Sequence, residues 1–348
     1  MRIEKAYGVL LVVLTLLGSC VKEQGPKRVD REPAVEFMPS LESAETKTTS
    51  PTSTALSTTI HFGVFGFEQE GVAGNPGTAG AWSQLATKHW TPAFMYNVEV
   101  YHNGSAWTYS PAKQWPSDVI NTITFWAYAP YSSSPDLLGS GTDTAYGTTS
   151  VGLPDVRYTV TDGSEDLLLS ALEQDLDKED GTVQFLFHHA LSQIRFFAKK
   201  VEADPANPRF TVTLTSVRLD GLKMTAVHRS GGWTDYGSTT GSITLISSSS
   251  NQALDTDYPG SPYATVMPLP QTFTGSGATL HLTYTIKSED MLTPRTAIHD
   301  IPLEDIFTAD WEEENQYTLK IKITPDDPIE FTVTWSSWGS ATNYNLTS

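Results

Sequence analysis

Apolar and polar side chains alternate with a period of two residues in many short stretches of this chain, which is the pattern of half-buried β-strands. The clearest stretches cover residues 60–64, 123–129, 183–187, 278–286, 317–323 and 329–335. In 123–129 both sets of alternating side chains are substantial, as expected for a strand at the centre of a sandwich. The pattern predicts about a dozen short strands at a spacing typical of β-sandwiches.

Two hairpins are predicted from the connections between these stretches. Residues 95–101 and 106–109 flank Asn103-Gly104, and an Asn-Gly pair between two alternating runs favours a tight turn. A short acidic loop joins 317–323 to 329–335, so we expect the chain to close with a second hairpin.

Residues 162–181 interrupt the strand pattern. This segment, acidic in its second half, is the one stretch whose pattern allows a helical turn, and it predicts a connector with a domain boundary near Asp180. The strands then fall into an N-terminal β-sandwich over 60–180 and a C-terminal β-sandwich over 181–348. Beyond the boundary the alternation changes parity between Phe187 and Ile194, so a bulge or turn is expected at 189–192.

The N-terminal residues have the pattern of an export signal. A short charged start precedes an apolar run over 6–17, which is shorter than the roughly 20 residues that span a bilayer. The run ends in Leu-Leu-Gly-Ser-Cys, which resembles a bacterial lipobox, and Cys20 is the only cysteine of the chain. We therefore expect a lipoprotein signal peptide over 1–20 and an acylated Cys20. The alternative is an ordinary cleaved signal followed by an incidental cysteine.

Residues 21–59 predict a tether that contains one short strand. Residues 21–33 are charged, contain two prolines and show no apolar period, which is typical of a flexible segment. A short apolar island with Val35 and Phe37 follows, and a Ser/Thr-rich stretch covers 46–59. The island predicts a lone strand between two loose segments.

Composition narrows the class of protein further. The chain of 348 residues has a formal net charge of -18, which argues against nucleic acid as a partner and leaves membrane attachment to acyl chains. With Cys20 acylated, no cysteine is left for a disulfide, so stability depends on apolar burial and strand pairing. Ser, Thr, Gly, Tyr and Trp are prominent and long helix-forming stretches are missing, which indicates an all-β protein.

No arrangement of catalytic or metal-binding residues is found in the sequence. His188 and His189 are adjacent on a predicted strand, so their side chains point to opposite faces and do not hold one metal ion together. We expect one of them to be packed and the other exposed. The acidic run at 175–181 has its glycine one place late for a calcium loop, and Leu186 stands where the last ligand belongs. Nucleophile-elbow and zinc-protease motifs are also missing. We therefore predict a protein that is not an enzyme and has no catalytic residue, metal or cofactor.

Tryptophans are concentrated in the first half and leave one alternative function open. They are Trp82, Trp90, Trp107, Trp115 and Trp126. Such side chains usually pack in cores and sheets, but exposed ones stack on sugars. A monomeric glycan-binding surface lipoprotein is therefore the alternative function.

Several stretches together resemble one protein family. They are the lipobox at Cys20, Thr-Lys-Thr at 46–48, and the segments 60–67, 107–116, 125–130, 185–196 and 329–335. In order and spacing they resemble the fimbrillins of Bacteroidetes, in particular the fimbrillin-like lipoproteins, over almost the whole chain. The resemblance implies an all-β protein with two tandem transthyretin-like β-sandwich domains of Greek-key type.

The same resemblance implies a structural subunit of a surface fimbria that supports cell adhesion. In this family a lipoprotein precursor reaches the outer membrane, a trypsin-like protease removes an N-terminal segment, and the emptied groove accepts a strand from a neighbouring subunit. The implied partners are other fimbrial subunits, the outer membrane through a lipid anchor, the processing protease, and a host or glycan ligand.

The steps of this assembly can be assigned to residues of the chain. The removable strand is the island with Val35 and Phe37. Trypsin-like cleavage needs an exposed basic residue in a mobile segment, and the candidates are Arg28, Arg31 and Lys47. Of these, only Lys47 follows the island, so the position of the cut decides whether the groove opens.

The C-terminal hairpin supplies the candidate donor strand. Its inserting row consists of Ile329, Phe331, Val333 and Trp335. The alternative is that these residues form an ordinary core hairpin of the second domain.

Overall fold

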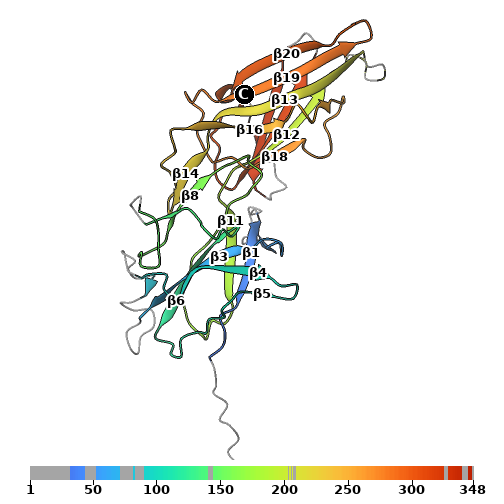
Figure 1. The fold of residues 1–348 in the computed structure, drawn as a ribbon. Helices are drawn as coiled ribbons and strands as arrows, with labels where there is room; N and C mark the ends of the chain where they lie inside the picture. Colours follow the sequence, from blue (N-terminus) through green and yellow to red (C-terminus); the bar gives the residue numbers. More distant parts are fainter. Residues whose placement is uncertain are drawn as a thin grey trace, which may run out of the picture.

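The structure is a computed structural model of the chain, and it describes residues 32–43, 52–70, 81–82, 90–139, 144–202, 204, 206, 209–324, 328–338 and 344–346. The described chain consists of β-strands and one single-turn helix, α1 (Leu303–Ile306), so the predicted all-β class is confirmed (Figure 1). The tandem transthyretin-like topology stays a prediction. Within the described residues, no helix has both the length and the apolar character needed to cross a bilayer.

Nine strands between residues 37 and 189 form one sheet. We call the chain up to residue 189 the first half and the remainder the second half. The order of the strands in this sheet is β2-β1-β11-β9-β6-β3-β4-β5, with β10 paired to β6. The strands are β1 (Phe37–Ser43), β2 (Thr52–Ala55), β3 (Phe62–Gln69), β4 (Met95–His102), β5 (Trp107–Thr108), β6 (Thr122–Ala129), β9 (Leu168–Ser170), β10 (Glu173–Leu176) and β11 (Val183–His189).

Strand β6 lies at the centre of this sheet and contributes to two cores. All eight of its residues are buried. Phe125 and Ala127 pack in one hydrophobic cluster, whereas Trp126 and Tyr128 pack in a second cluster that extends into the other half of the chain. The prediction of a central strand with two substantial faces is confirmed.

Two further sheets form most of the second half. One has the order β18-β12-β21-β22-β23, and the other has the order β16-β13-β19-β20 with β17 paired to β13. The strands are β12 (Gln193–Lys200), β13 (Phe210–Lys223), β16 (Thr240–Ile246), β17 (Gln252–Ala253), β18 (Ala264–Val266), β19 (Thr279–Ser288), β20 (Arg295–Pro302), β21 (Asn315–Ile323), β22 (Glu330–Ser337) and β23 (Tyr344–Leu346). Phe196, Leu214, Leu282 and Leu319, one from each of four strands, are fully buried in their shared core.

Both predicted hairpins are present. Strand β4 pairs with β5, and Gly104 in their connection has φ of 96°, a left-handed conformation that glycine adopts without strain. Strand β21 pairs with β22 along eight residues.

A fourth sheet joins the two halves. Its order is β15-β14-β8-β7, with β7 (Leu137–Leu138) and β8 (Asp155–Thr159) from the first half and β14 (Thr225–Arg229) and β15 (Gly232–Thr234) from the second. Figure 1 shows β8 and β14 side by side between the first sheet and the sheets of the second half. The sequence did not predict this sheet.

The predicted helical turn in 162–181 is wrong. The segment contains β9 and β10, which pair with strands of the first sheet. Leu168 and Leu169 are buried on opposite faces of that sheet, and Asp175 has φ of 56°, which is incompatible with a right-handed helix.

Strand pairing also bears on the domain boundary. Strand β11 follows the predicted boundary at Asp180, yet it pairs with β1 and β9 in the first sheet. The chain then turns at 190–192 and enters β12 in another sheet. We therefore propose a boundary between His189 and Gln193.

The joining sheet contains an ion pair between the halves that can be tested. Arg229 on β14 donates a hydrogen bond to Asp155 on β8, with 2.9 Å between Nη1 and Oδ2, and Asp155 is 7% exposed. Arg229→Ala leaves this carboxylate buried without its cation. We expect the free energy of unfolding in urea to fall by about 3 kcal/mol, the lower end of the range for buried ion pairs, because the Arg229 side chain is 27% exposed.

The exposed ion pair between Lys322 and Glu330 is the control. Lys322→Ala is expected to change the free energy of unfolding by less than about 1 kcal/mol, because water solvates exposed charges well. Equal losses in the two variants would show that the pair between β8 and β14 has no special role.

Candidate functional site

The candidate functional site is the position that β1 occupies in the first sheet. Strand β1 pairs in parallel with β11, from Phe37 opposite Val183 to Leu41 opposite Phe187 (Figure 1). Directly before it, the Val183 N–H donates a hydrogen bond of 2.9 Å to the Glu36 carbonyl. The predicted strand is thus present, but it is not alone, because β2 pairs with its other edge.

The residues before β1 are tied to the loop that follows β5. The Val35 N–H donates to the Lys113 carbonyl at 2.9 Å, and the Trp115 N–H donates to the Pro33 carbonyl at 3.1 Å. The Tyr109 hydroxyl donates to the Val35 carbonyl at 2.9 Å. Burial raises the pKa of Tyr109, so its hydroxyl stays protonated and remains a donor at neutral pH.

Phe37 is the centre of an aromatic cluster. It is 5% exposed, and its ring stacks on Phe185 with 5.5 Å between the centroids. Phe125 and Phe62 meet it edge to face at 5.8 and 6.5 Å. Val35 is buried in the same cluster. Burial of side chains of this size stabilises a fold by roughly 1.5–3 kcal/mol each. Loss of β1 would remove Val35 and Phe37 from this cluster and leave an apolar groove lined by the remaining rings.

The backbone of β11 depends on β1 as well. Ladder pairing between β11 and β9 covers only Phe187 to His189, whereas β1 pairs with Val183 to Phe187. Without β1, the first part of β11 would present unpaired main-chain groups, which is the usual template for strand addition. Pro39 lies within β1 and has no N–H, so β1 itself makes fewer main-chain bonds than its length allows.

Lipidation and processing are not tested by the structure. Cys20, Arg28, Arg31 and Lys47 all lie outside the described residues. Their roles stay predictions.

The candidate donor row belongs to β22 and its preceding loop. Val333 is 3% exposed, and its neighbours in the row are partly buried against the same core of the second half; these are Ile329, Phe331 and Trp335. Strand β22 pairs with β21 on one edge and with β23 on the other. In the monomer this row therefore contributes to the chain's own core.

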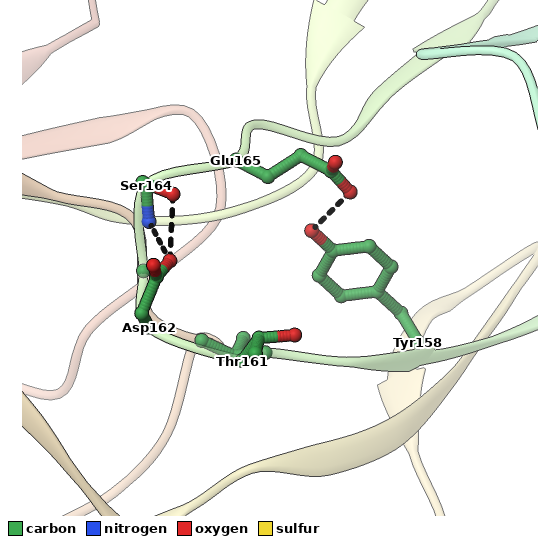
Figure 2. A pocket seen from close by; sticks show the side chains of 7 residues that line it. Tyr158, Thr161, Asp162, Ser164 and Glu165 are labelled. Carbon is green, nitrogen blue, oxygen red and sulfur yellow. Dashed lines mark hydrogen bonds between the residues drawn. The ribbon is translucent and has the colours of Figure 1, made fainter.

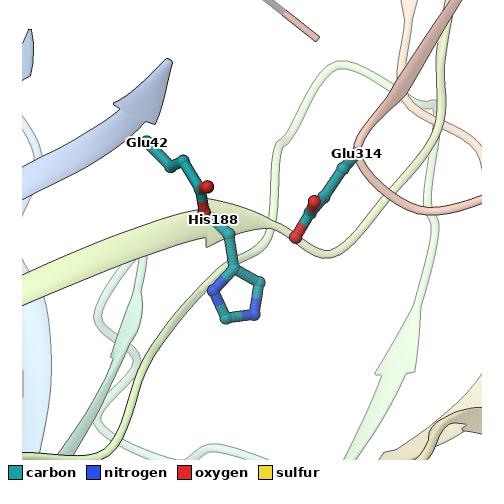
Figure 3. Close-up of side chains that lie close together, drawn as sticks. All are labelled: Glu42, His188 and Glu314. Atoms are coloured by element: carbon teal, nitrogen blue, oxygen red, sulfur yellow. The ribbon is translucent and has the colours of Figure 1, made fainter. Parts of the chain in front are cut away.

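A second group of side chains, which the sequence did not predict, lies at the end of β11. Glu42 on β1, His188 on β11 and Glu314 directly before β21 converge there (Figure 3). One potential metal-ligand atom from each residue lies within 4.8 Å of the other two. Burial lowers the pKa of His188. Glu314 is exposed, and partial desolvation together with the negative charge of Glu42 raises its pKa.

The two adjacent histidines have different surroundings. His189 Nδ1 forms a hydrogen bond of 2.6 Å with Asp166, and its ring stacks on Trp338 at 3.7 Å between centroids. Both histidines are half-buried, so the expectation that one is packed and the other exposed is wrong. No local sequence signal could have found the group around His188, because its three members are far apart in the chain.

A small polar pocket of about 200 Å³ follows β8, and its lining residues are Tyr158 and 160–165 (Figure 2). The Tyr158 hydroxyl donates to Glu165 at 3.3 Å, and the Ser164 hydroxyl donates to Asp162 at 2.6 Å. The bond from Ser164 lowers the pKa of Asp162, and burial raises the pKa of Tyr158. The lining residues thus bond to one another, as in an ordinary turn.

The tryptophans of the first half pack mainly inside the protein. Trp82, Trp115 and Trp126 are 2%, 3% and 7% exposed. Trp90 and Trp107 are partly buried and pack against the two cores. This arrangement does not favour the alternative function, which needs exposed rings to stack on sugars.

Known proteins share features with this chain. It is 27% identical to Fimbrium subunit Fim1C of Phocaeicola vulgatus over 232 residues, which are 63% of this chain and 56% of that protein, so the match spans little more than half of the relative. The fold is similar to the crystal structure of a fimbrial protein from Bacteroides vulgatus, with a TM-score of 0.57 and 22% identity, covering 80% of this chain and 92% of that one.

The match to a protein family extends over most of the chain. A sequence model described as fimbrillin-like matches residues 48–338, from within the predicted tether to the residue after β22. The chain therefore belongs to the fimbrillin-like family.

Proposed function

We propose that this chain is a structural subunit of a surface fimbria, exported to the outer membrane as a lipoprotein acylated at Cys20 and assembled by strand exchange to support cell adhesion. Family membership and the similarity to a fimbrium subunit support the fimbrial role. The observation that carries the assembly step is the burial of β1, a strand from the N-terminal tether that completes both the sheet and the core of the first half.

Proteolysis by a trypsin-like enzyme is the step that would allow β1 to leave the groove. A cut after Lys47 separates all of β1 from the rest of the chain, whereas a cut after Arg28 or Arg31 leaves β1 in place. Once β1 dissociates, the apolar floor around Phe185 and the unpaired edge of β11 both favour an incoming extended strand. The partner that supplies it is another fimbrial subunit.

The donor strand in this proposal is the stretch 329–335. Its apolar row repeats every two residues, as does the buried row of Val35, Phe37 and Pro39 that leaves the groove. Donation requires β22 to leave β21 and its own core first, because Val333 is buried there in the monomer.

The contribution of β1 to the core can be measured with two adjacent substitutions. Phe37→Ala removes the ring that contacts Phe185 and is expected to lower the free energy of unfolding by about 3–5 kcal/mol, measured by urea denaturation of the full chain. Met38 is 55% exposed, so Met38→Ala is the matched control and is expected to have a small effect. Equal effects of the two substitutions would contradict a special role of Phe37.

The position of the cut can be tested by limited digestion with trypsin. The unmodified protein is expected to lose its N-terminal segment and form a ladder of polymers on a gel, because the groove opens. Lys47→Gln is expected to abolish the ladder, and the double substitution Arg28→Gln/Arg31→Gln, as control, to preserve it. A trimmed protein that stays monomeric while polysaccharide retards it on a native gel would overturn the fimbrial proposal in favour of the glycan-binding alternative.

The role of β22 can be tested by locking it to β21. Lys320 and Thr332 are direct partners in this antiparallel pair, where Cα atoms are about 4.5–5.5 Å apart, within the range that a disulfide bridges. We expect Lys320→Cys/Thr332→Cys, in a Cys20→Ser background, to stay monomeric after trypsin treatment when oxidised and to polymerise when reduced.

The matched control locks a different pair of strands. Thr285 and Thr296 are partners between β19 and β20, so Thr285→Cys/Thr296→Cys is expected to polymerise in both redox states. If the oxidised lock between β21 and β22 also polymerises, β22 is a core strand and the donor lies elsewhere.

A further inference from the structure

We propose that Glu42, His188 and Glu314 form a binding site for a divalent transition-metal ion such as Zn²⁺, and that the ion clamps β1 to the second half of the chain. The three ligands come from three elements: Glu42 from β1, His188 from β11, and Glu314 from the turn before β21 (Figure 3). The ion would thereby link two strands of the first sheet, β1 and β11, to the turn before β21 in the second half.

The geometry of the three side chains is the first argument. One potential ligand atom of each lies within 4.8 Å of those of the other two. Ligand atoms of a tetrahedral Zn²⁺ site with bonds of roughly 2.1 Å lie about 3.4 Å apart, so binding needs a contraction of the order of 1 Å. The two glutamate side chains can supply it by rotation about their side-chain bonds.

The second argument is that, among the described residues, these three side chains have no hydrogen-bond or ion-pair partner, whereas the neighbouring histidines do. In the part of the chain that the structure describes, none of the three side chains forms a hydrogen bond or an ion pair with another residue. The neighbouring imidazoles each already have a carboxylate partner: His189 pairs with Asp166 at 2.6 Å and His228 with Glu313 at 3.3 Å.

Electrostatics point in the same direction. Two carboxylates of like charge approach each other here, and no lysine or arginine of the described residues forms an ion pair with either. Such a pair is unfavourable unless a cation lies between its members. A divalent ion would offset both charges at once, and a water molecule would complete four-coordination.

The donor set selects the class of metal. One imidazole nitrogen and two carboxylate oxygens suit Zn²⁺ and its neighbours in the first transition row, whereas Ca²⁺ and Mg²⁺ favour six or more oxygen ligands. The three side chains fall short of that number. Zn²⁺ is therefore the probe for the test, with Ca²⁺ as the comparison.

The consequence for assembly rests on the proposed function. An ion that binds only while Glu42 is in place stabilises the form that retains β1, because ligands shift an equilibrium towards the state they bind. The metal-loaded precursor is then expected to lose β1 more slowly after cleavage than the metal-free precursor.

The site is tested by titrating Zn²⁺ into the chelator-stripped full chain in a calorimeter. We expect one site in the unmodified protein, and affinity at least about tenfold weaker in each of Glu42→Gln, His188→Gln and Glu314→Gln. Glu36→Gln, on the same segment, and His61→Gln, which removes an exposed imidazole paired with Glu99, are matched controls with unchanged affinity. Circular dichroism of each metal-free variant establishes that it folds.

Three outcomes of this titration overturn the site. The first is binding by the three ligand variants as tightly as by the unmodified protein, which would place the metal elsewhere. The second is tighter binding of Ca²⁺ than of Zn²⁺, and the third is no saturable binding of Zn²⁺ at all. The titration involves neither cleavage nor polymerisation, so its result does not depend on the fimbrial function.

The effect on β1 is measured separately by adding trypsin with and without Zn²⁺ and following release of the N-terminal fragment by gel filtration. We expect Zn²⁺ to slow release from the unmodified protein but not from His188→Gln. Equal release rates with and without Zn²⁺ would contradict the clamp. Failure of the trimmed protein to polymerise, with intact Zn²⁺ binding, would instead count against the proposed function alone.

Discussion

The parallel pairing of β1 with β11 is the interaction on which the first half of this protein depends. The first residues of β11 have their ladder partners in β1, and the side chains of Val35 and Phe37 complete the core beneath them. A chain without β1 must expose both the backbone edge and the aromatic floor, or find another strand. Because strands bury every second residue, the substitute must carry apolar side chains two residues apart. The stretch 329–335 has this spacing.

The other end of β11 connects this interaction to the rest of the molecule. After His189 the chain turns into β12, which belongs to the core of the second half. The pairing of β8 with β14, reinforced by the ion pair of Asp155 with Arg229, holds the two halves together beside this turn. Strand β11, the pairing partner of β1, therefore ends where the sheets of the two halves meet. Glu314, from the second half, lies near the same place.

The sequence predicted the elements whose pattern is local. Alternation identified β6 and β19, and Asn103-Gly104 located the β4–β5 hairpin. It failed for residues 162–181, because β9 and β10 are too short to show a period and their acidic neighbours resemble a helical connector. Pairing between distant segments leaves no local signal, so the joining sheet and the group of Glu42, His188 and Glu314 emerged only from the structure. The island at Val35 and Phe37 was the exception, since an apolar pair in a charged tether is conspicuous.

In the proposed function, one N-terminal segment carries the lipid, the strand that fills the groove and one ligand of the metal site. Cys20 carries the lipid, Phe37 fills the groove and Glu42 contributes to the metal site, and all three precede Lys47. One cut after Lys47 would therefore detach from the rest of the chain a single segment that carries the lipid, the strand that fills the groove and one ligand of the clamp. A cut after Arg28 or Arg31 would release the lipid alone and leave a soluble subunit whose groove is still filled. Since the core gains nothing from losing β1 until a donor replaces it, cleavage by itself does not empty the groove. The rate at which β1 leaves, which its own burial and any bound cation both slow, then controls the rate of assembly.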